Sequence, residues 1–200
     1  MKPIDFWYSI GSTYTYLTVM RLQDYARENG VSFRWRPFNV RSLMIEQKNI
    51  PFTGKPEKTA YMWRDIERRA AKYSLPVSVP APYPLEELAL ANQVALLGHR
   101  EGWGQEYTIE SYRLWFVDGQ PAGSEPNISE ALRRAGQDPA RALEVARSPE
   151  ITQALVAETG ICRDAGVFGA PSFVVDREAF WGDDSLDDAV SWRKYGKLTG

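Results

Sequence analysis

Residues 4–37 have the sequence IDFWYSIGSTYTYLTVMRLQDYARENGVSFRWRP, and their hydrophobic pattern decides the fold class. The run 4–9 is short, apolar and aromatic, which predicts a buried strand. From residue 13 apolar side chains recur at helical spacing, and Gly30 ends a predicted helix of about four turns. Residues 31–37 alternate between apolar and polar side chains and predict a second strand. A strand, a helix and a strand in this order form a right-handed crossover whose strands are parallel neighbours.

The end of the chain returns to strand-forming residues. Residues 172–175 and 179–181 are mainly apolar and flank a turn region at 177–178, which predicts a β-hairpin. Acidic residues then precede an amphipathic run over 186–192, which predicts a final helix with a first turn that suits the helix dipole.

The middle of the chain, from 40 to 166, is predicted to be almost wholly helical. Apolar residues recur there at helical spacing in segments separated by Pro- or Gly-bearing turns, near 57–73, 85–101, 105–118, 128–135, 139–147 and 149–165. Residues 76–84 contain four prolines and predict a rigid, extended connection, because proline fixes φ.

This order of elements predicts an α/β protein with a large helical insertion. We assign residues 1–40 and 167–200 to one sheet-containing domain and residues 41–166 to an inserted helical domain. If the crossover unit and the hairpin pair into one sheet, the fold is thioredoxin-like.

Composition narrows the classes of function. The 44% hydrophobic and 25% charged residues exclude a mainly disordered chain, and 24 basic against 26 acidic residues argue against nucleic acid or an anionic membrane as a partner. One cysteine, Cys162, excludes an internal disulfide and a zinc cage, so no metal site is predicted. Without a signal-like or apolar segment of about 20 residues, we expect a cytoplasmic protein.

The turn between the first strand and the first helix is one candidate site. Either Ser12 or Thr13 simply caps the helix, or the Ser12 hydroxyl and nearby N–H groups hold an anion. Thioredoxin-fold oxidoreductases carry Cys-x-x-Cys at this turn, whereas this chain has Ser-Thr-Tyr-Thr over 12–15. Because a hydroxyl cannot form a mixed disulfide, dithiol chemistry is excluded there. The interpretation that this chemistry leaves is a site that stabilises the thiolate of a bound ligand.

Two further motifs each allow two interpretations. Pro171 either starts a strand or forms a cis bond that faces the turn, so that Ala170 presents its backbone to an extended peptide. Asp183 and Asp184 either cap the last helix or bind the ammonium group of a small peptide.

The chain resembles the family of 2-hydroxychromene-2-carboxylate isomerases and kappa-class glutathione transferases, which are DsbA-like proteins. Its opening DFWYSIGSTYTYL is similar to the family's D-F-x-x-D-x-x-S-P-[YF]-[ST]-[YW]-L. Two positions depart from this pattern, with Ser9 where Asp is common and Thr13 where Pro is usual. The other matches follow in family order and cover nearly the whole chain: Asn49-Ile50-Pro51, Pro56-x-Lys58-x-x-Tyr61-x-x-x-Asp65, Gly166 to Pro171, and Phe180-Trp181-Gly182-Asp183-Asp184.

The resemblance implies glutathione as the bound thiol and a homodimer as the assembly. On the family pattern, Ser12 bonds the glutathione sulfur and Asn49 contacts the glycyl end. Ala170, before a cis Pro171, pairs with the cysteinyl backbone, and Asp183 and Asp184 lie at the γ-glutamyl end.

The implied reaction is isomerisation of an unsaturated keto acid derived from an aromatic compound. The family's isomerases interconvert 2-hydroxychromene-2-carboxylate and trans-o-hydroxybenzylidenepyruvate, intermediates of naphthalene breakdown, by reversible thiolate addition. Two alternatives stay open: a kappa-class-like transferase or peroxidase that consumes glutathione, and a non-catalytic thioredoxin-fold binding module.

Several other polar residues are assigned no catalytic role. His99 is predicted to be a solvated charge at a helix end, and Cys162 a small buried residue on a helix. Lys58, Arg64 and Arg41 are candidates to meet a substrate carboxylate, but we expect each to be a solvated surface charge.

Overall fold

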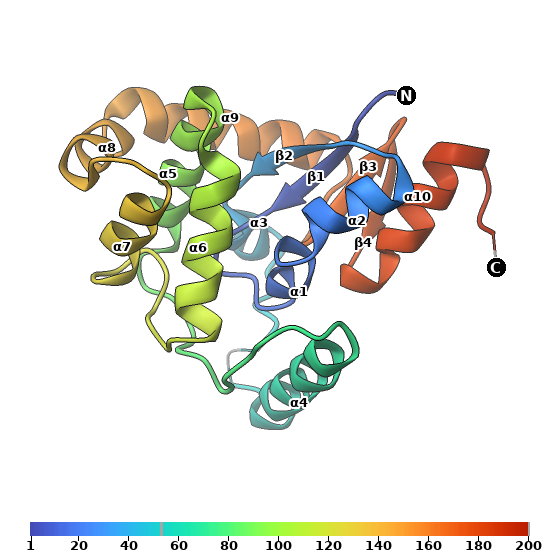
Figure 1. The fold of residues 1–200 in the computed structure, drawn as a ribbon, viewed down its shortest axis with the longest axis horizontal. Coiled ribbons are helices and arrows are strands. Elements are labelled where there is room, and N and C mark those ends of the chain that lie inside the picture. Colours follow the sequence, from blue (N-terminus) through green and yellow to red (C-terminus); the bar gives the residue numbers. More distant parts are fainter. Residues whose placement is uncertain (53, 200) are drawn as a thin grey trace.

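A computed structural model describes residues 1–52 and 54–199, with one mixed sheet at its centre (Figure 1). The strand order is β2-β1-β3-β4. Strand β1 (Ile4–Tyr8) pairs in parallel with β2 (Phe33–Pro37) and antiparallel with β3 (Ser172–Val175). Strand β4 (Glu178–Trp181) completes the predicted hairpin with β3. The two ends of the chain therefore share one sheet, which confirms the predicted thioredoxin-like arrangement.

The hairpin turn lies one residue earlier than predicted, at Asp176 and Arg177. Both residues have positive φ, 48° and 78°, as in the two-residue turns whose twist matches that of the strands. Glu178 is already paired with Val175 in the ladder.

The single helix predicted between the first two strands is wrong, because the structure has two helices there. These are α1 (Thr15–Val19) and α2 (Leu22–Asn29), and Gly30 ends α2 in the left-handed conformation. At the break, Arg21 leaves the helical conformation with φ −123°. Its side chain turns to Asp183.

The helical middle is confirmed, with element ends within a few residues of the prediction. A first short helix, α3 (Val40–Glu46), was not singled out from the sequence, although Asn39 caps it by accepting the N–H of Ser42. The remaining helices are α4 (Pro56–Lys72), α5 (Leu88–Glu101), α6 (Gly104–Phe116), α7 (Asn127–Arg134), α8 (Pro139–Ala146) and α9 (Pro149–Asp164).

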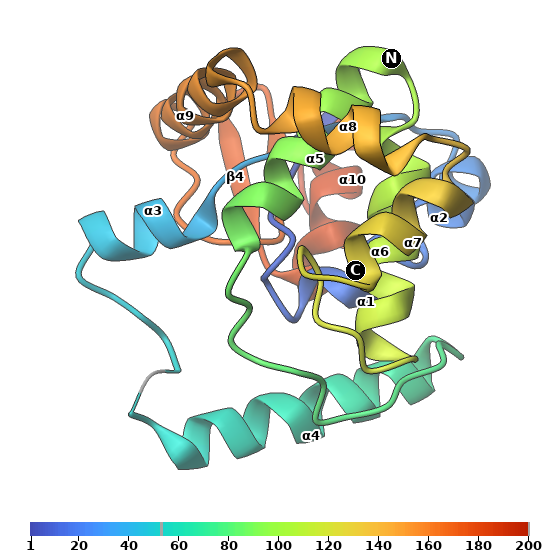
Figure 2. The same ribbon diagram turned by 90° about the vertical axis from the view of Figure 1, so that its left-hand side faces the viewer.

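One helix stands apart from this block. Helix α4 lies at one end of the molecule, away from α5, α7 and α8, and long connections lead into and out of it (Figures 1 and 2). The second connection is the predicted proline-rich segment. It is held by the side chain of Tyr16, which donates to Pro76 O, and by Trp115 Nε1, which donates to Pro82 O at 2.7 Å.

The chain closes with the 3₁₀ turn η1 (Asp183–Ser185) and α10 (Leu186–Tyr195). One hydrophobic core contains residues from the sheet and from the helical block, including Phe6, Tyr16, Phe116 and Leu132. The division into domains 1–40 with 167–200 and 41–166 stays a prediction. Within the described ranges, each helix is too short or too polar to cross a bilayer.

Candidate active site

A cavity of about 310 Å³ lies where the turn after β1, the connection after α3, helix α4 and the segment before β3 meet. It brings together three residues that were predicted from the sequence, Ser12, Asn49 and Ala170. Most of the other lining residues are apolar or aromatic, and sequence reasoning did not single out their role in a cavity: Met44, Phe52, Met62, Tyr83, Phe168 and Trp181.

Ser12 faces the segment before β3. Its Oγ donates to Ala170 O at 2.7 Å, and the peptide bond from Ala170 to Pro171 is cis. Neither Ser12 nor Thr13 caps the helix: α1 follows Tyr14 at its N-cap position, which has no side-chain cap. The capping interpretation is therefore wrong, and the Ser12 hydroxyl is presented at the cavity wall.

The backbone of this turn is tightly constrained. Gly11 has φ +129°, and a Cβ there would lie 2.1 Å from Leu88 Cδ1. The Ser12 N–H donates to Ser9 O at 3.0 Å, while Tyr112 OH lies 2.8 Å from Ser9 O and 3.1 Å from Ser12 O. The N–H and the hydroxyl of Ser12 therefore both donate within the protein, to Ser9 O and to Ala170 O.

The two departures from the family pattern fit this turn. Ser9 is fully buried, and its hydroxyl accepts the N–H of Val40 at 3.3 Å, so a neutral residue stands where a carboxylate is common. Thr13 is also buried and donates to Met62 Sδ at 3.0 Å. The turn is therefore joined directly to α4.

Asn49 and Lys58 approach the cavity from exposed positions. Asn49 follows α3, and its N–H donates to Met44 O at 2.9 Å, which fixes the backbone but leaves the side chain exposed. Lys58 is exposed as predicted, yet it lines the cavity, with Nζ 5.5 Å from the centre of the Phe52 ring.

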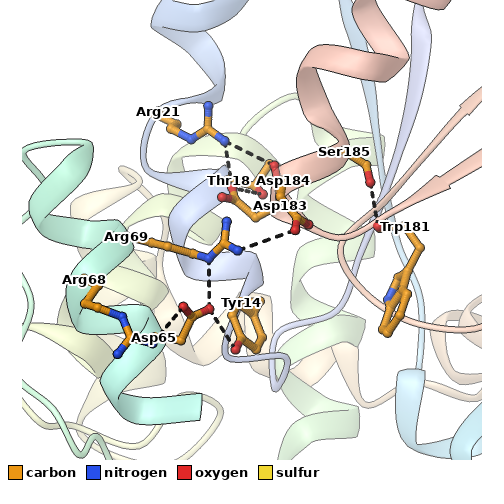
Figure 3. A network of polar contacts seen from close by, with 10 residues as sticks. All are labelled: Tyr14, Thr18, Arg21, Asp65, Arg68, Arg69, Trp181, Asp183, Asp184 and Ser185. Atoms are coloured by element: carbon orange, nitrogen blue, oxygen red, sulfur yellow. Dashed lines mark hydrogen bonds and ion pairs between the residues drawn. The ribbon is translucent and has the colours of Figure 1, made fainter. Parts of the chain in front are cut away.

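Asp183 and Asp184 are not among the residues that line the cavity. They lie beside Arg21 and Arg69 in a network of polar contacts (Figure 3). Asp183 is 2% exposed, and its Oδ1 accepts from Thr18 Oγ1 at 2.8 Å and Arg21 Nη2 at 2.9 Å. Asp184 is exposed and lies 3.4 Å from Arg69 Nη2. Neither caps α10, so that alternative is wrong. Their placement at the γ-glutamyl end of a tripeptide stays a prediction.

A chain of polar contacts ties the cavity wall to this corner (Figure 3). Asp65 on α4 accepts from Tyr14 OH at 3.1 Å and from Arg69 Nε at 2.9 Å, and Arg69 reaches on to Asp184. Partial burial opposes ionisation of Asp65, but hydrogen bonds from Arg69, Arg68 and Tyr14 outweigh it and lower its pKa. Burial and the charge of Asp65 raise the pKa of Tyr14, which keeps its hydroxyl protonated.

The structure contradicts the prediction that His99 is a solvated charge. His99 is half-buried, its Nε2 lies 2.9 Å from Tyr8 OH, and burial lowers its pKa to about 4. It is neutral at pH 7 and lies outside the cavity lining. Cys162 is buried on α9 as predicted, and burial raises the pKa of its thiol.

The prediction of a solvated surface charge is also wrong for Arg41. Arg41 is half-buried, and its Nη2 donates to Leu85 O. Arg64, by contrast, is exposed and pairs with Glu67 on the same helix.

Fold and turn together define a DsbA-like thioredoxin domain, and the family described as "DSBA-like thioredoxin domain" matches residues 3–191. Within it, the chain belongs to the family of 2-hydroxychromene-2-carboxylate isomerases and kappa-class glutathione transferases.

Two relatives support this assignment, and a solved structure matches the fold. The chain is 31% identical over 198 residues to 2-hydroxychromene-2-carboxylate isomerase of Sphingobium xenophagum, with 96% of this chain and 97% of that protein covered. It is 22% identical to glutathione S-transferase kappa 1 of Caenorhabditis elegans, with 92% and 87% covered. A solved structure of 2-hydroxychromene-2-carboxylate isomerase matches the fold with a TM-score of 0.82, 22% identity, and 92% and 91% covered. The resemblance found in the sequence is confirmed.

Proposed function

We propose that this protein is a glutathione-dependent isomerase of an unsaturated keto acid derived from an aromatic compound. The observation that carries the proposal is the Ser12 hydroxyl, held 2.7 Å from the carbonyl of Ala170 beside a cis proline at the wall of a largely apolar cavity. Relatives named as 2-hydroxychromene-2-carboxylate isomerases favour this activity.

The cavity fits a thiol peptide in size and in donor chemistry. Its volume is within the usual range of small-molecule sites, about 300–1,000 Å³. On our proposal Ser12 bonds the sulfur, Ala170 before Pro171 pairs with the cysteinyl backbone, and Asn49 contacts the glycyl end. Asp183 and Asp184 would serve the γ-glutamyl end, where the exposed carboxylate of Asp184 is the more accessible of the two.

When bound, glutathione would supply a nucleophilic thiolate for reversible addition to the conjugated keto acid, the chemistry that would allow rotation about the former double bond. Ser12 would donate its one proton to that thiolate and release the carbonyl of Ala170. The released carbonyl can then accept a backbone N–H of the tripeptide. This exchange keeps both polar groups partnered.

The energies are sufficient without a general base. A thiol with a pKa of about 8.5 is only a few per cent ionised at pH 7, and lowering that pKa by about two units takes about 2.7 kcal/mol. A hydrogen bond to a charged group contributes about 1.5–3 kcal/mol. Helix α1 has five residues and begins three residues after Ser12, so we expect its dipole to contribute only about 0.3 kcal/mol. The Ser12 hydroxyl therefore has to supply most of the stabilisation.

The proposal is tested by mixing protein, glutathione and 2-hydroxychromene-2-carboxylate. We expect calorimetric binding of glutathione, conversion to trans-o-hydroxybenzylidenepyruvate, and an unchanged concentration of free thiol. Absence of glutathione binding would reject the proposal and favour a non-catalytic binding module.

A transferase or peroxidase is the second candidate, because relatives include kappa-class glutathione transferases at 22% and 24% identity. Loss of free thiol with a chlorinated aromatic electrophile, without isomerisation of the chromene acid, would favour it. The proposal further includes a homodimer, which sedimentation would test.

A further inference from the structure

A second recess, of about 710 Å³, lies beside the candidate thiol site. Several residues line both the recess and the first cavity: Gly11, Met44, Pro51, Phe52 and Tyr83. Because Gly11 directly precedes Ser12, a molecule in the recess would lie next to the position proposed for the sulfur.

The recess has walls suited to a flat, conjugated molecule. Phe52 and Tyr83 meet edge to face, with ring centres 6.0 Å apart. Aliphatic side chains supply most of the remaining lining, among them Val40, Met44, Ile45 and Leu88. Such surroundings favour an apolar ring system over a hydrated sugar or phosphate.

Arg41 is the cation of the recess. Its Nη2 donates to Leu85 O and its Nη1 lies 3.5 Å from Glu86 O, so two backbone carbonyls orient the guanidinium. A guanidinium has five N–H donors, and these contacts leave others for a ligand.

The charge of Arg41 has no protein counterion in the described parts of the chain, residues 1–52 and 54–199. The other half-buried arginines all pair with carboxylates: Arg21, Arg36, Arg69, Arg113 and Arg193. Glu86 also lines the recess, but its carboxylate makes no ion pair with Arg41. A half-buried, oriented and unpaired guanidinium is well suited to an incoming carboxylate.

We propose that Arg41 binds the carboxylate of the second substrate while the recess holds its conjugated ring. The reaction served by this site rests on the proposed function, whereas preference for a planar carboxylate is a property of the recess itself. Of the other two cations considered from the sequence, Arg64 pairs with Glu67 and Lys58 lines the thiol cavity instead.

The test compares 2-naphthoate with its neutral analogue 2-naphthamide, by calorimetry without glutathione. We expect the protein to bind the acid more tightly, and Arg41→Gln to weaken the acid about tenfold to a hundredfold while leaving the amide nearly unchanged. Arg147→Gln removes the same charge from an exposed position and should change neither affinity. Equal affinity of the unaltered protein for acid and amide, or equal weakening of both by Arg41→Gln, would overturn the assignment.

A second measurement separates this inference from the proposed function. With the chromene acid, Arg41→Gln should raise KM by a similar factor and leave the Kd of glutathione unchanged. If glutathione fails to bind but the affinity for naphthoate still depends on Arg41, the proposed reaction fails and the carboxylate site stands. If Arg41→Gln leaves both the KM for the chromene acid and the affinity for naphthoate unchanged, the carboxylate site fails and the proposed reaction stands.

Discussion

At the scale of single residues, the Ser12 hydroxyl has a role that can be measured directly. If it is the main donor to the bound sulfur, Ser12→Ala should raise the pKa of bound glutathione by about one to two units, since a charge-assisted hydrogen bond contributes about 1.5–3 kcal/mol. Thiolate absorbance at about 240 nm, titrated in the presence of saturating glutathione, measures that pKa. Turnover of the chromene acid should fall in parallel.

Ser12→Thr is the matched control, because it keeps the hydroxyl. It should retain most of the thiolate signal. An unchanged thiolate titration in Ser12→Ala would remove Ser12 from the mechanism even if turnover fell.

The residue before Ser12, Gly11, has a backbone conformation that suits only glycine. At φ +129° any side chain is strained, and a Cβ would also meet Leu88 Cδ1 at 2.1 Å. We expect Gly11→Ala to lower the free energy of unfolding by about 1–3 kcal/mol, measured by urea denaturation. Adding Leu88→Ala would relieve the contact but not the backbone strain, so it should not restore stability.

At the scale of elements, α4 supplies one wall of the cavity that Ser12 lines. It carries Lys58, Tyr61 and Met62, which line the cavity. Its Arg69 bonds Asp184 in η1, the turn that follows β4. Arg69→Gln should therefore speed amide hydrogen exchange across 56–72 and weaken glutathione binding. Arg68→Gln is the control, because Arg68 is exposed and its contacts, with Asp65 and with the ring of Tyr61, stay within α4. Equal exchange in both variants would contradict the linking role.

How well each element could be predicted depends on how local its causes are. The helices after residue 55 follow from apolar spacing and from prolines at their first turns, as at Pro149, and their ends were close. The break at Arg21 was missed because it comes with a contact to Asp183, far along the chain. Ser12 and Ala170 were singled out from the predicted turn and the following proline, and Asn49 through the family motif. Arg41 was named as a candidate for a substrate carboxylate but expected to be a solvated charge, because its burial and its contacts with Leu85 and Glu86 arise only in the folded chain.

At the scale of the whole molecule, His99 joins three parts of the fold. It lies on α5, bonds Tyr8 of β1, and shares that hydroxyl with Thr108 of α6 at 2.8 Å. Burial lowers its pKa to about 4, against about 6.5 when unfolded. Between these pH values His99 is protonated in the unfolded chain but neutral in the folded protein. The free energy of unfolding should therefore fall as pH drops from about 6.5 to about 4. The full difference between the folded and unfolded pKa values of His99 corresponds to about 3 kcal/mol in the free energy of unfolding.

The measurement is urea denaturation at several pH values for the unaltered protein and for His99→Gln. Carboxylates with lowered pKa values, such as Asp65, also cost stability in acid, so the informative quantity is the difference between the two proteins. His99→Gln should lose stability at pH 7 through the altered bond to Tyr8, yet its stability should change less between pH 6.5 and pH 4.5. Parallel pH profiles would show that His99 titrates normally in the folded protein, which would contradict a buried neutral ring between sheet and helices.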